Sequence, residues 1–452
     1  MELQLALWRG VYLSKVVEIE GARLKNFLHF QRDSLGFMTS VLHLGDIVSV
    51  RSSKRTPSYI LNHPEAIREV LISKEQSFRK GRSSRILRET VGQGILTTEG
   101  KKHDHQRQSM LPAFHKQRIQ EYAPIVIEQA TRAFDEWQDG EERWVHRDFM
   151  MLTLTVIMQT LFGAKLKEDA ERVARAVEET IQYTAKRMYS PIPLPKFIPT
   201  RGNLRHTQSM GVLHQTAKGF VQQQEKRDSP TLLRHLLEED GVEEQELIDQ
   251  IITMLIAGHE TTANALSWTW YLLSQHPEVE VKWREELDCV LGDRPPTYED
   301  LTKLSYTQQI WQESLRLYPP AWMILREANE DVEILGEPFT RNSIFMISPY
   351  SLHRNPQYFD QPEKFMPERF APEAVKSIPR YAYLPFGAGS RSCIGNQFAS
   401  MEATLIMVLL AQRYRLVLAP AQAPIQAEPS VSLRIKGGLK MLVKSRSDQS
   451  RK

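Results

Sequence analysis

The sequence predicts a mainly α-helical protein with a small β part, folded as a single domain over residues 1–452. Apolar residues recur at three- and four-residue spacing from about 64 to 317, which is the period of a helix. Strand-like segments lie near 40–62, near 320–350 and close to the C-terminus. Because no Gly/Ser linker, long charge run or fixed-period repeat divides the chain, we expect one domain despite its length.

Composition narrows the possible functions. Lys and Arg total 58 against 55 for Asp and Glu, a formal net charge of +3, whereas nucleic-acid-binding domains usually carry a strongly basic patch. The stretch 1–10 is too short and too polar for a membrane span, which needs about 20 apolar residues, and it lacks a signal-peptide pattern. Two cysteines, Cys289 and Cys393, argue against a disulfide framework. We therefore expect a cytoplasmic protein with no membrane span and no nucleic-acid partner.

The N-terminal part of the sequence contains candidate strands that are followed by candidate helices. Ile47–Val50 and Tyr59–Leu61 are the best early strands, and Asn62-His63-Pro64 predicts a turn into the first helix of the long helical part. Further along, 190–199 contains four prolines in nine residues and cannot continue a helix. It is predicted to be a surface connection between two helices.

The longest predicted helix covers about Glu244–Gln275, which contains no proline. Its first half carries an apolar stripe, and Trp268–Leu273 is apolar on nearly all sides. A helix that is apolar around most of its circumference is central and buried. Strands are predicted at Val332–Leu335 and Ser343–Ile347. A last helix is predicted at about Asn396–Arg413, and a strand follows near 439–443.

The segment from Phe386 to Gly395 carries the most specific chemistry. Its glycines let the backbone turn tightly and approach a flat cofactor closely. A helix that begins just after Cys393 would point its amide donors at the sulfur and favour the thiolate. Arg391, two residues before it, can reach an anionic group beside it.

This segment resembles the haem-binding loop of the cytochrome P450 family, Phe-x-x-Gly-x-Arg-x-Cys-x-Gly, at every fixed position. The resemblance implies the P450 fold and haem b (iron protoporphyrin IX), with Cys393 as the metal ligand and Phe386, Gly387 and Gly395 among the cofactor-binding residues. A thiolate bound to haem iron favours cleavage of the O–O bond. The implied activity is that of a monooxygenase, an oxidoreductase that hydroxylates its substrate with O₂.

Two further motifs occur in the order of that family. Glu313 and Arg316 resemble its Glu-x-x-Arg pair, and Arg369 lies in a segment similar to its later Pro-Glu-Arg-Phe element. The resemblance implies a buried ionic network that supports the cysteine loop without taking part in catalysis. Removing one partner would leave a buried charge unpaired, at a cost of about 3–5 kcal/mol.

The middle of the long helix, Ala257-Gly258-His259-Glu260-Thr261-Thr262, resembles the oxygen-activation motif of the family. Gly258 has poor helix propensity and the hydroxyl of Thr261 can compete for backbone carbonyls, so the helix is expected to be weakened here. The resemblance implies that Glu260 and Thr261 are the catalytic acid–alcohol pair that delivers protons.

Four residues fall at positions where the family holds the haem propionates. They are His103, Arg107, Arg326 and Arg391, and arginine suits carboxylates through its forked donors. His103 departs from the tryptophan that is usual at its position, and each of the four could instead be an ordinary surface residue.

The resemblance also implies where a small apolar substrate would lie. The predicted lining residues are Leu255, Ile256, Ala257, Ala321, Trp322, Met323 and Ile324, with the turn near 432–438. Arg82, Arg85 and Arg88 could anchor a carboxylate, so a fatty acid is the first expectation, with steroids, terpenoids and macrolactones open.

Electrons are expected to come from a separate ferredoxin or flavodoxin with its reductase. The basic segment around Lys101, Lys102, Arg107, Lys116 and Arg118 could bind such an acidic partner, although it could equally be a solvated helix. Two other functions stay open. The first is a P450-fold peroxygenase or hydroperoxide-rearranging enzyme, and the second is a non-enzymatic haem-binding sensor or carrier.

Overall fold

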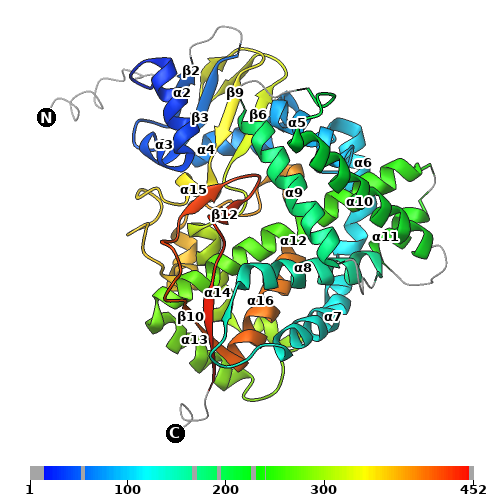
Figure 1. Ribbon diagram of the computed structural model, residues 1–452. Coiled ribbons are helices and arrows are strands. Elements are labelled where there is room, and N and C mark those ends of the chain that lie inside the picture. Colours follow the sequence, from blue (N-terminus) through cyan, green and yellow to red (C-terminus); the bar gives the residue numbers. More distant parts are fainter. Residues whose placement is uncertain are drawn as a thin grey trace, which may run out of the picture.

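A computed structural model describes residues 15–51, 56–164, 170–190, 195–224, 231–239 and 241–446 (Figure 1). The helices of this structure are α2 (Arg23–Arg32), α3 (Ser34–Ser40), α4 (Pro64–Arg68), α5 (Gly81–Val91), α6 (Gly100–Met110), α7 (Lys116–Asp135), α8 (Val145–Phe162), α9 (Ala170–Tyr189), α10 (Arg201–Gln224), α11 (Leu232–Leu237), α12 (Glu244–Gln275), α13 (Pro277–Val290), α14 (Ser305–Leu317), α15 (Pro349–Leu352) and α16 (Asn396–Arg413). The strands are β1 (Val16–Glu18), β2 (Ile47–Arg51), β3 (Ser58–Leu61), β4 (Phe78–Arg79), β5 (Glu142–Arg143), β6 (Ile324–Ala328), β7 (Val332–Ile334), β8 (Glu337–Phe339), β9 (Ile344–Ile347), β10 (Tyr414–Leu418), β11 (Ala427–Pro429), β12 (Leu433–Ile435) and β13 (Met441–Ser445).

The largest sheet combines strands from both ends of the chain. Its order is β1-β2-β3-β9-β6-β4, so early strands pair with strands nearly 300 residues later, and β3 runs parallel to β9. Figure 1 shows this sheet beside α2 and α3 at one side of the molecule, with the long helices filling the other. A second sheet, β10-β13-β5, and the hairpins β11-β12 and β7-β8 complete the β part.

Helix α12 crosses the middle of the helical part, as predicted from its apolar circumference (Figure 1). Glu244 and Glu246 lie in its first turn, where carboxylates interact favourably with the positive end of the helix dipole. Trp268 and Trp270 are almost fully buried, and the indole of Trp268 stacks on Tyr318 at 3.8 Å. The helix packs against α8, α14 and α16.

The predicted mainly α fold with a small β part is confirmed, and the predicted bounds of α12 and α16 are those observed. The turn before Pro64 is also confirmed, because Nδ1 of His63 accepts a hydrogen bond of 3.2 Å from the backbone N–H of Glu65. The short strands β4 and β5 lie within the stretch 64–317, which the periodicity predicts to be mostly helical. Each is two residues long and pairs with a distant strand, so local periodicity does not reveal it.

Within the predicted proline-rich connection, 191–194 lie outside the described residues. The part that is described begins at Pro195 and leads into α10, and Phe197 exposes 86% of its surface there, as expected of a surface connection. Across the described ranges, none of the helices combines the length and the apolar character needed to cross a membrane.

Candidate active site

The loop that carries Cys393 is closed by its own backbone. The N–H of Cys393 donates to the carbonyl of Phe386 at 2.9 Å, and the N–H of Ser392 donates to the carbonyl of Gly389 at 3.1 Å. Gly389 has a φ of +75°, and a Cβ added there would lie 2.0 Å from the carbonyl oxygen of Leu71. Glycine is therefore required at this position both for its backbone conformation and for the close approach of the turn that follows α4.

The side chain of Cys393 is accessible to solvent although protein surrounds it on nearly all sides. Burial raises the pKa of this thiol, and the N–H of Gly395 and the charge of Arg107 oppose the shift. A thiol of this kind stays protonated at neutral pH unless a metal cation stabilises the thiolate, so its setting suits a metal ligand rather than a free nucleophile.

Arg107 attaches α6 to the cysteine loop. Its guanidinium donates to the carbonyl oxygen of Ser392 at 2.8 Å and to the hydroxyl of the same residue at 3.4 Å. The sequence placed Arg107 among the propionate ligands, whereas the structure engages it with the residue next to Cys393. Its charge acts here on the thiol.

Positively charged side chains gather beside this loop. Arg326 on β6 is 9% exposed and Lys80 lies just before α5; burial and the charge of Arg391 lower the pKa of Arg326 to about 10 and that of Lys80 to about 7. Burial also lowers the pKa of His103, and Lys80 and Arg391 contribute to that shift. Three predicted cofactor-binding residues, His103, Arg326 and Arg391, thus lie in one electrostatic cluster.

The cluster contains more cations than carboxylates. Arg391 pairs with Glu99 at 2.6 Å and more loosely with Glu75 at 3.8 Å, whereas Nε of Arg326 has no hydrogen-bond partner in the described part of the structure. Lys80 donates to three backbone carbonyls. The residues therefore fit a group that offers a metal ion to the thiolate of Cys393 and carboxylates to the positively charged cluster. An iron porphyrin with two propionates is such a group.

The central turn of α12 has three consecutive carbonyls that accept hydroxyl hydrogen bonds. Thr261 donates to Ala257 at 2.8 Å, Thr262 donates to Gly258 at 3.2 Å, and Thr153 of α8 donates to His259 at 3.1 Å. This competition for backbone acceptors is what the sequence predicted for the turn. A Cβ at Gly258 would lie 2.8 Å from Cδ1 of Ile157, so glycine permits α8 and α12 to pack closely here.

Glu260 and Thr261 lie on different sides of this turn. Thr261 is partly accessible, whereas Glu260 is 3% exposed and hydrogen bonds with Ser432 and Asn264. Burial raises the pKa of Glu260 to about 7, and these hydrogen bonds and the charge of Arg434 limit the rise. An acid that titrates near neutral pH is suited to proton transfer.

The predicted lining residues separate into two groups. Ala257, Ala321, Met323 and Ile324 are accessible at least in part, while Leu255 and Ile256 are 0% and 4% exposed. Trp322 is also buried; it packs with Leu35 and Leu433, and its indole N–H donates to the carbonyl of Ser430 at 3.0 Å. This placement gives Trp322 a packing role, because its ring is enclosed by the core.

The predicted ionic network forms as expected from the motifs. Glu313 and Arg316 are both 0% exposed and joined by hydrogen bonds of 2.6 and 2.8 Å, and Arg369 donates to Glu313 at 3.3 Å. Arg316 also donates to the carbonyls of His353 and Pro362. The remaining donors of the buried guanidinium are thus satisfied by backbone acceptors, as a buried charge requires.

His353 was not identified from the sequence, yet it connects this network to the cysteine loop. Its Nε2 accepts from the N–H of Leu384 at 2.8 Å, and its Nδ1 lies 3.1 Å from the carbonyl oxygen of Arg316. Burial lowers the pKa of His353 to about 3, so it is neutral. A neutral imidazole protonated at Nδ1 satisfies both contacts at once.

Two other residues were missed for different reasons. Lys80 lies in a short basic run, which usually indicates a solvated surface. Glu402 stands in the apolar stretch of α16 and is 0% exposed beside Thr262; burial raises its pKa well above the ordinary value. A single acid within an apolar helical run is a signal that could have identified it.

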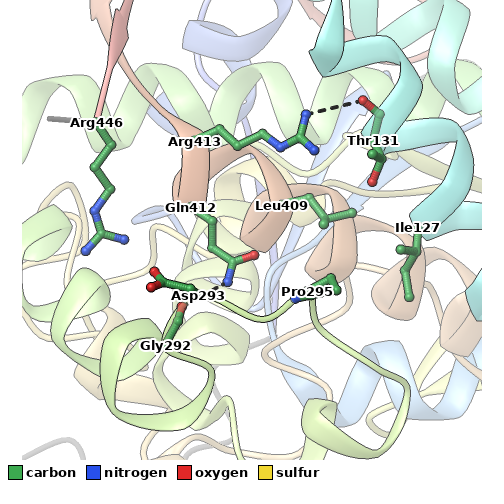
Figure 2. Close-up of a pocket in the computed structure, with 9 residues that line it drawn as sticks. All are labelled: Ile127, Thr131, Gly292, Asp293, Pro295, Leu409, Gln412, Arg413 and Arg446. Carbon is green, nitrogen blue, oxygen red and sulfur yellow. Dashed lines mark hydrogen bonds between the residues drawn. The ribbon is translucent and has the colours of Figure 1, made fainter. Parts of the chain in front are cut away.

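A surface cavity of about 350 Å³ lies apart from these residues (Figure 2). Its walls come from α7, the turn after α13, the end of α16 and Arg446, and none of the predicted site residues lines it. Figure 2 shows that the side chain of Arg413 points toward the carbonyl of Thr131, to which it donates a hydrogen bond.

Comparisons with known proteins agree with the geometry. A family model described as Cytochrome P450 matches residues 27–442. The cyclooctat-9-en-7-ol 5-monooxygenase of Streptomyces melanosporofaciens is 35% identical over 85% of each chain, and the pentalenene oxygenase of Streptomyces avermitilis is 32% identical over 86% of this chain and 88% of its own. The crystal structure of CYP175A1 from Thermus thermophillus superposes with a TM-score of 0.79 at 25% identity, covering 95% of this chain and all of that one.

The family model spans the motifs around Cys393, Glu313 and Glu260. This chain belongs to the cytochrome P450 family of haem monooxygenases.

Proposed function

We propose that this monooxygenase inserts one atom of O₂ into a cyclic terpenoid hydrocarbon or alcohol, with electrons from a separate ferredoxin or flavodoxin. The observation that carries the proposal is the accessible, deeply placed thiol of Cys393 within a loop closed by the Phe386 carbonyl. Haem b, when bound, supplies the iron at which O₂ is activated. Cys393 would bind this iron, with Phe386, Gly387 and Gly395 beside the ring.

His103, Lys80, Arg326 and Arg391 would hold the propionates. The excess of buried positive charge over carboxylates supports this role, because two propionates would neutralise it. Arg107 would instead keep α6 against the loop and favour the thiolate through its charge.

Glu260 and Thr261 would manage protons. The acid form of Glu260 is populated near neutral pH, and the hydroxyl of Thr261, held by the carbonyl of Ala257, lies on the accessible side of α12. A carboxyl that holds a proton near neutral pH, next in sequence to an alcohol that can pass the proton on, supports general-acid catalysis.

A terpenoid substrate is favoured over a fatty acid. The names of two relatives state that they act on an alcohol, cyclooctat-9-en-7-ol, and on a hydrocarbon, pentalenene. The fatty-acid expectation depended on α5 arginines, of which Arg88 donates to the carbonyl of Thr97 at 2.6 Å and Arg85 lies 3.9 Å from Glu327. The side chain of Arg82, the third of them, lies outside the described residues.

The test is the absorption spectrum of the purified protein, reduced and exposed to carbon monoxide. A strongly red-shifted Soret band is expected from thiolate-ligated haem, and Cys393→His should move the band to the position typical of a histidine ligand. Retention of the red-shifted band in Cys393→His would contradict the ligand assignment.

The substrate class is tested on the same protein by spin-state titration. Cyclic terpenoid hydrocarbons and alcohols are expected to shift the resting spectrum at lower concentration than fatty acids of equal carbon number. The opposite order would overturn the substrate proposal. Full turnover with peroxide and without reductant would instead identify a peroxygenase.

A further inference from the structure

The carboxyl of Glu260 lies beside the hairpin β11-β12. Ser432, just before β12, and Asn264, one helical turn further along α12, act on this carboxyl as hydrogen-bonding groups that lower its pKa. Asn264 also donates to the hydroxyl of Ser432 at 2.8 Å. All three side chains are at most 6% exposed, so they form a closed polar triad between a helix and a hairpin.

Two hydrogen bonds of the Leu433 backbone hold the hairpin in place beside α12. The indole N–H of Trp268 donates to the carbonyl of Leu433 at 3.3 Å, and the N–H of Leu433 donates to the carbonyl of Pro320 at 2.9 Å. Ser432 therefore cannot move away from Glu260 without breaking contacts on both sides of it. The position of its hydroxyl is a property of the fold.

Two charges act on this triad from opposite sides. Arg434 of β12 favours the carboxylate form of Glu260, and Glu178 of α9 opposes it. Arg434 pairs with Glu428 at 2.6 Å, and the side chains of this pair are 28% and 36% exposed. The hairpin thus connects a buried acid to charged groups that reach solvent.

We propose that Ser432, Asn264 and Arg434 are positioning residues that hold the Glu260 carboxyl on the hairpin side of α12 and control its release of a proton. The inference rests on the proposed function, in which Glu260 supplies protons on the side of Thr261. Ser432 and Asn264 stabilise the charged carboxylate by donating to it, and Arg434 does so through its charge. Transfer toward Thr261 then requires the carboxyl to leave these donors.

The test is an infrared pH titration of the holoenzyme that follows the C=O stretch of a protonated carboxylic acid. Glu260→Gln removes the Glu260 band and so assigns it. In Ser432→Ala the midpoint of this band is expected to rise by about one to two pH units, because a hydrogen bond to a charged group is worth that much. Arg434→Gln, at a partly exposed position that the fold tolerates more easily, is expected to raise it by a smaller amount.

Matched variants separate this effect from general perturbation. Ser432→Thr and Arg434→Lys keep the hydroxyl and the charge, and should restore the midpoint. Ser267→Ala removes another buried hydroxyl of α12, whose partner is the carbonyl of Ala263, and should leave the midpoint unchanged.

An unchanged midpoint in both Ser432→Ala and Arg434→Gln would overturn the inference. The pH profile of product formed per reducing equivalent gives a second reading, and its alkaline limb should move upward together with the infrared midpoint. If Glu260→Gln left that ratio unchanged, the proton-delivery function would fail, while a shifted infrared midpoint would still support the positioning triad.

Discussion

Two buried carboxyls beside the central turn of α12 differ in the donors available to them. Glu260 has Ser432, Asn264 and the charge of Arg434, and burial raises its pKa only to about 7. Glu402 is 0% exposed, and the hydroxyl of Thr262 only partly offsets burial, so its pKa lies well above the ordinary value. Burial therefore favours the neutral form of Glu402, whereas Glu260 can change its charge near neutral pH.

We predict that the stability of the protein falls with rising pH because of Glu260. Its pKa is raised on folding, so the native state retains a proton between the ordinary pKa of 4.5 and about 7, where the unfolded chain has lost it. The contribution is fully present below 4.5 and is lost as the pH rises through 7. One pKa unit corresponds to about 1.4 kcal/mol, so the whole effect amounts to roughly 3 kcal/mol.

Glu260→Gln removes this titration. The unfolding free energy of the variant relative to the unchanged protein, measured with denaturant, should increase by roughly 3 kcal/mol between about pH 4 and pH 8. A difference that stays constant across this range would show that the carboxyl does not titrate near neutral pH.

At the scale of elements, α14 is tied to the cysteine loop through backbone atoms. Arg316 donates to the carbonyl of His353, and His353 accepts the N–H of Leu384, two residues before the loop begins at Phe386. These hydrogen bonds connect the loop to a buried helix and so limit its movement. This explains how a segment without regular structure can keep Cys393 in place.

We predict that Glu313→Gln lowers the unfolding free energy by about 3–5 kcal/mol, because it leaves Arg316 charged and fully buried without its carboxylate. Denaturant unfolding of the haem-loaded protein measures this change. The matched control is Glu121→Gln, which breaks another Glu–Arg pair with 2.6 Å between the charged atoms and three-residue spacing, but with both side chains more than a third exposed.

The control should cost less than about 1 kcal/mol, since solvent screens exposed pairs. Equal losses in the two variants would indicate that the buried network contributes no more than a surface ion pair.

At the scale of the whole molecule, the face formed by α6 and the start of α7 lies over the cysteine loop. Lys101, Lys102 and Lys116 are exposed on these two helices, and Arg107 connects α6 to Ser392. Helix α2 lies at the opposite side of Figure 1. An acidic electron donor bound at the basic face would approach the thiol side of the site.

We predict that Lys101→Glu slows reduction by an acidic ferredoxin or flavodoxin by roughly three- to tenfold at low ionic strength, because it weakens electrostatic steering. Stopped-flow reduction at increasing salt should show the difference disappear as screening increases. The control, Lys25→Glu on α2, makes the same change of charge far from this face and should leave the rate unaltered. Equal slowing by both variants would exclude a specific docking face.

Much of the fold and part of the site could be predicted from the sequence. The bounds of α12 and α16 and the pairing of Glu313 with Arg316 were correct, because each depends on residues close together in the chain. Helical periodicity, the absence of proline and a three-residue spacing are local properties. The sequence alone was likewise sufficient to identify the family from the loop around Cys393, where the spacing of fixed residues is dictated by one tight turn.

Only the tertiary structure decided which distant groups meet. Ser432 reaches Glu260 from a hairpin far along the chain, Lys80 joins Arg326 and Arg391, and Trp322 turns into the core although its neighbours stay accessible. Such contacts depend on how strands and helices remote in the chain are packed, and burial then changes the proton affinity of the groups they enclose. The residue types specify the available chemistry, and packing determines which of them can perform it.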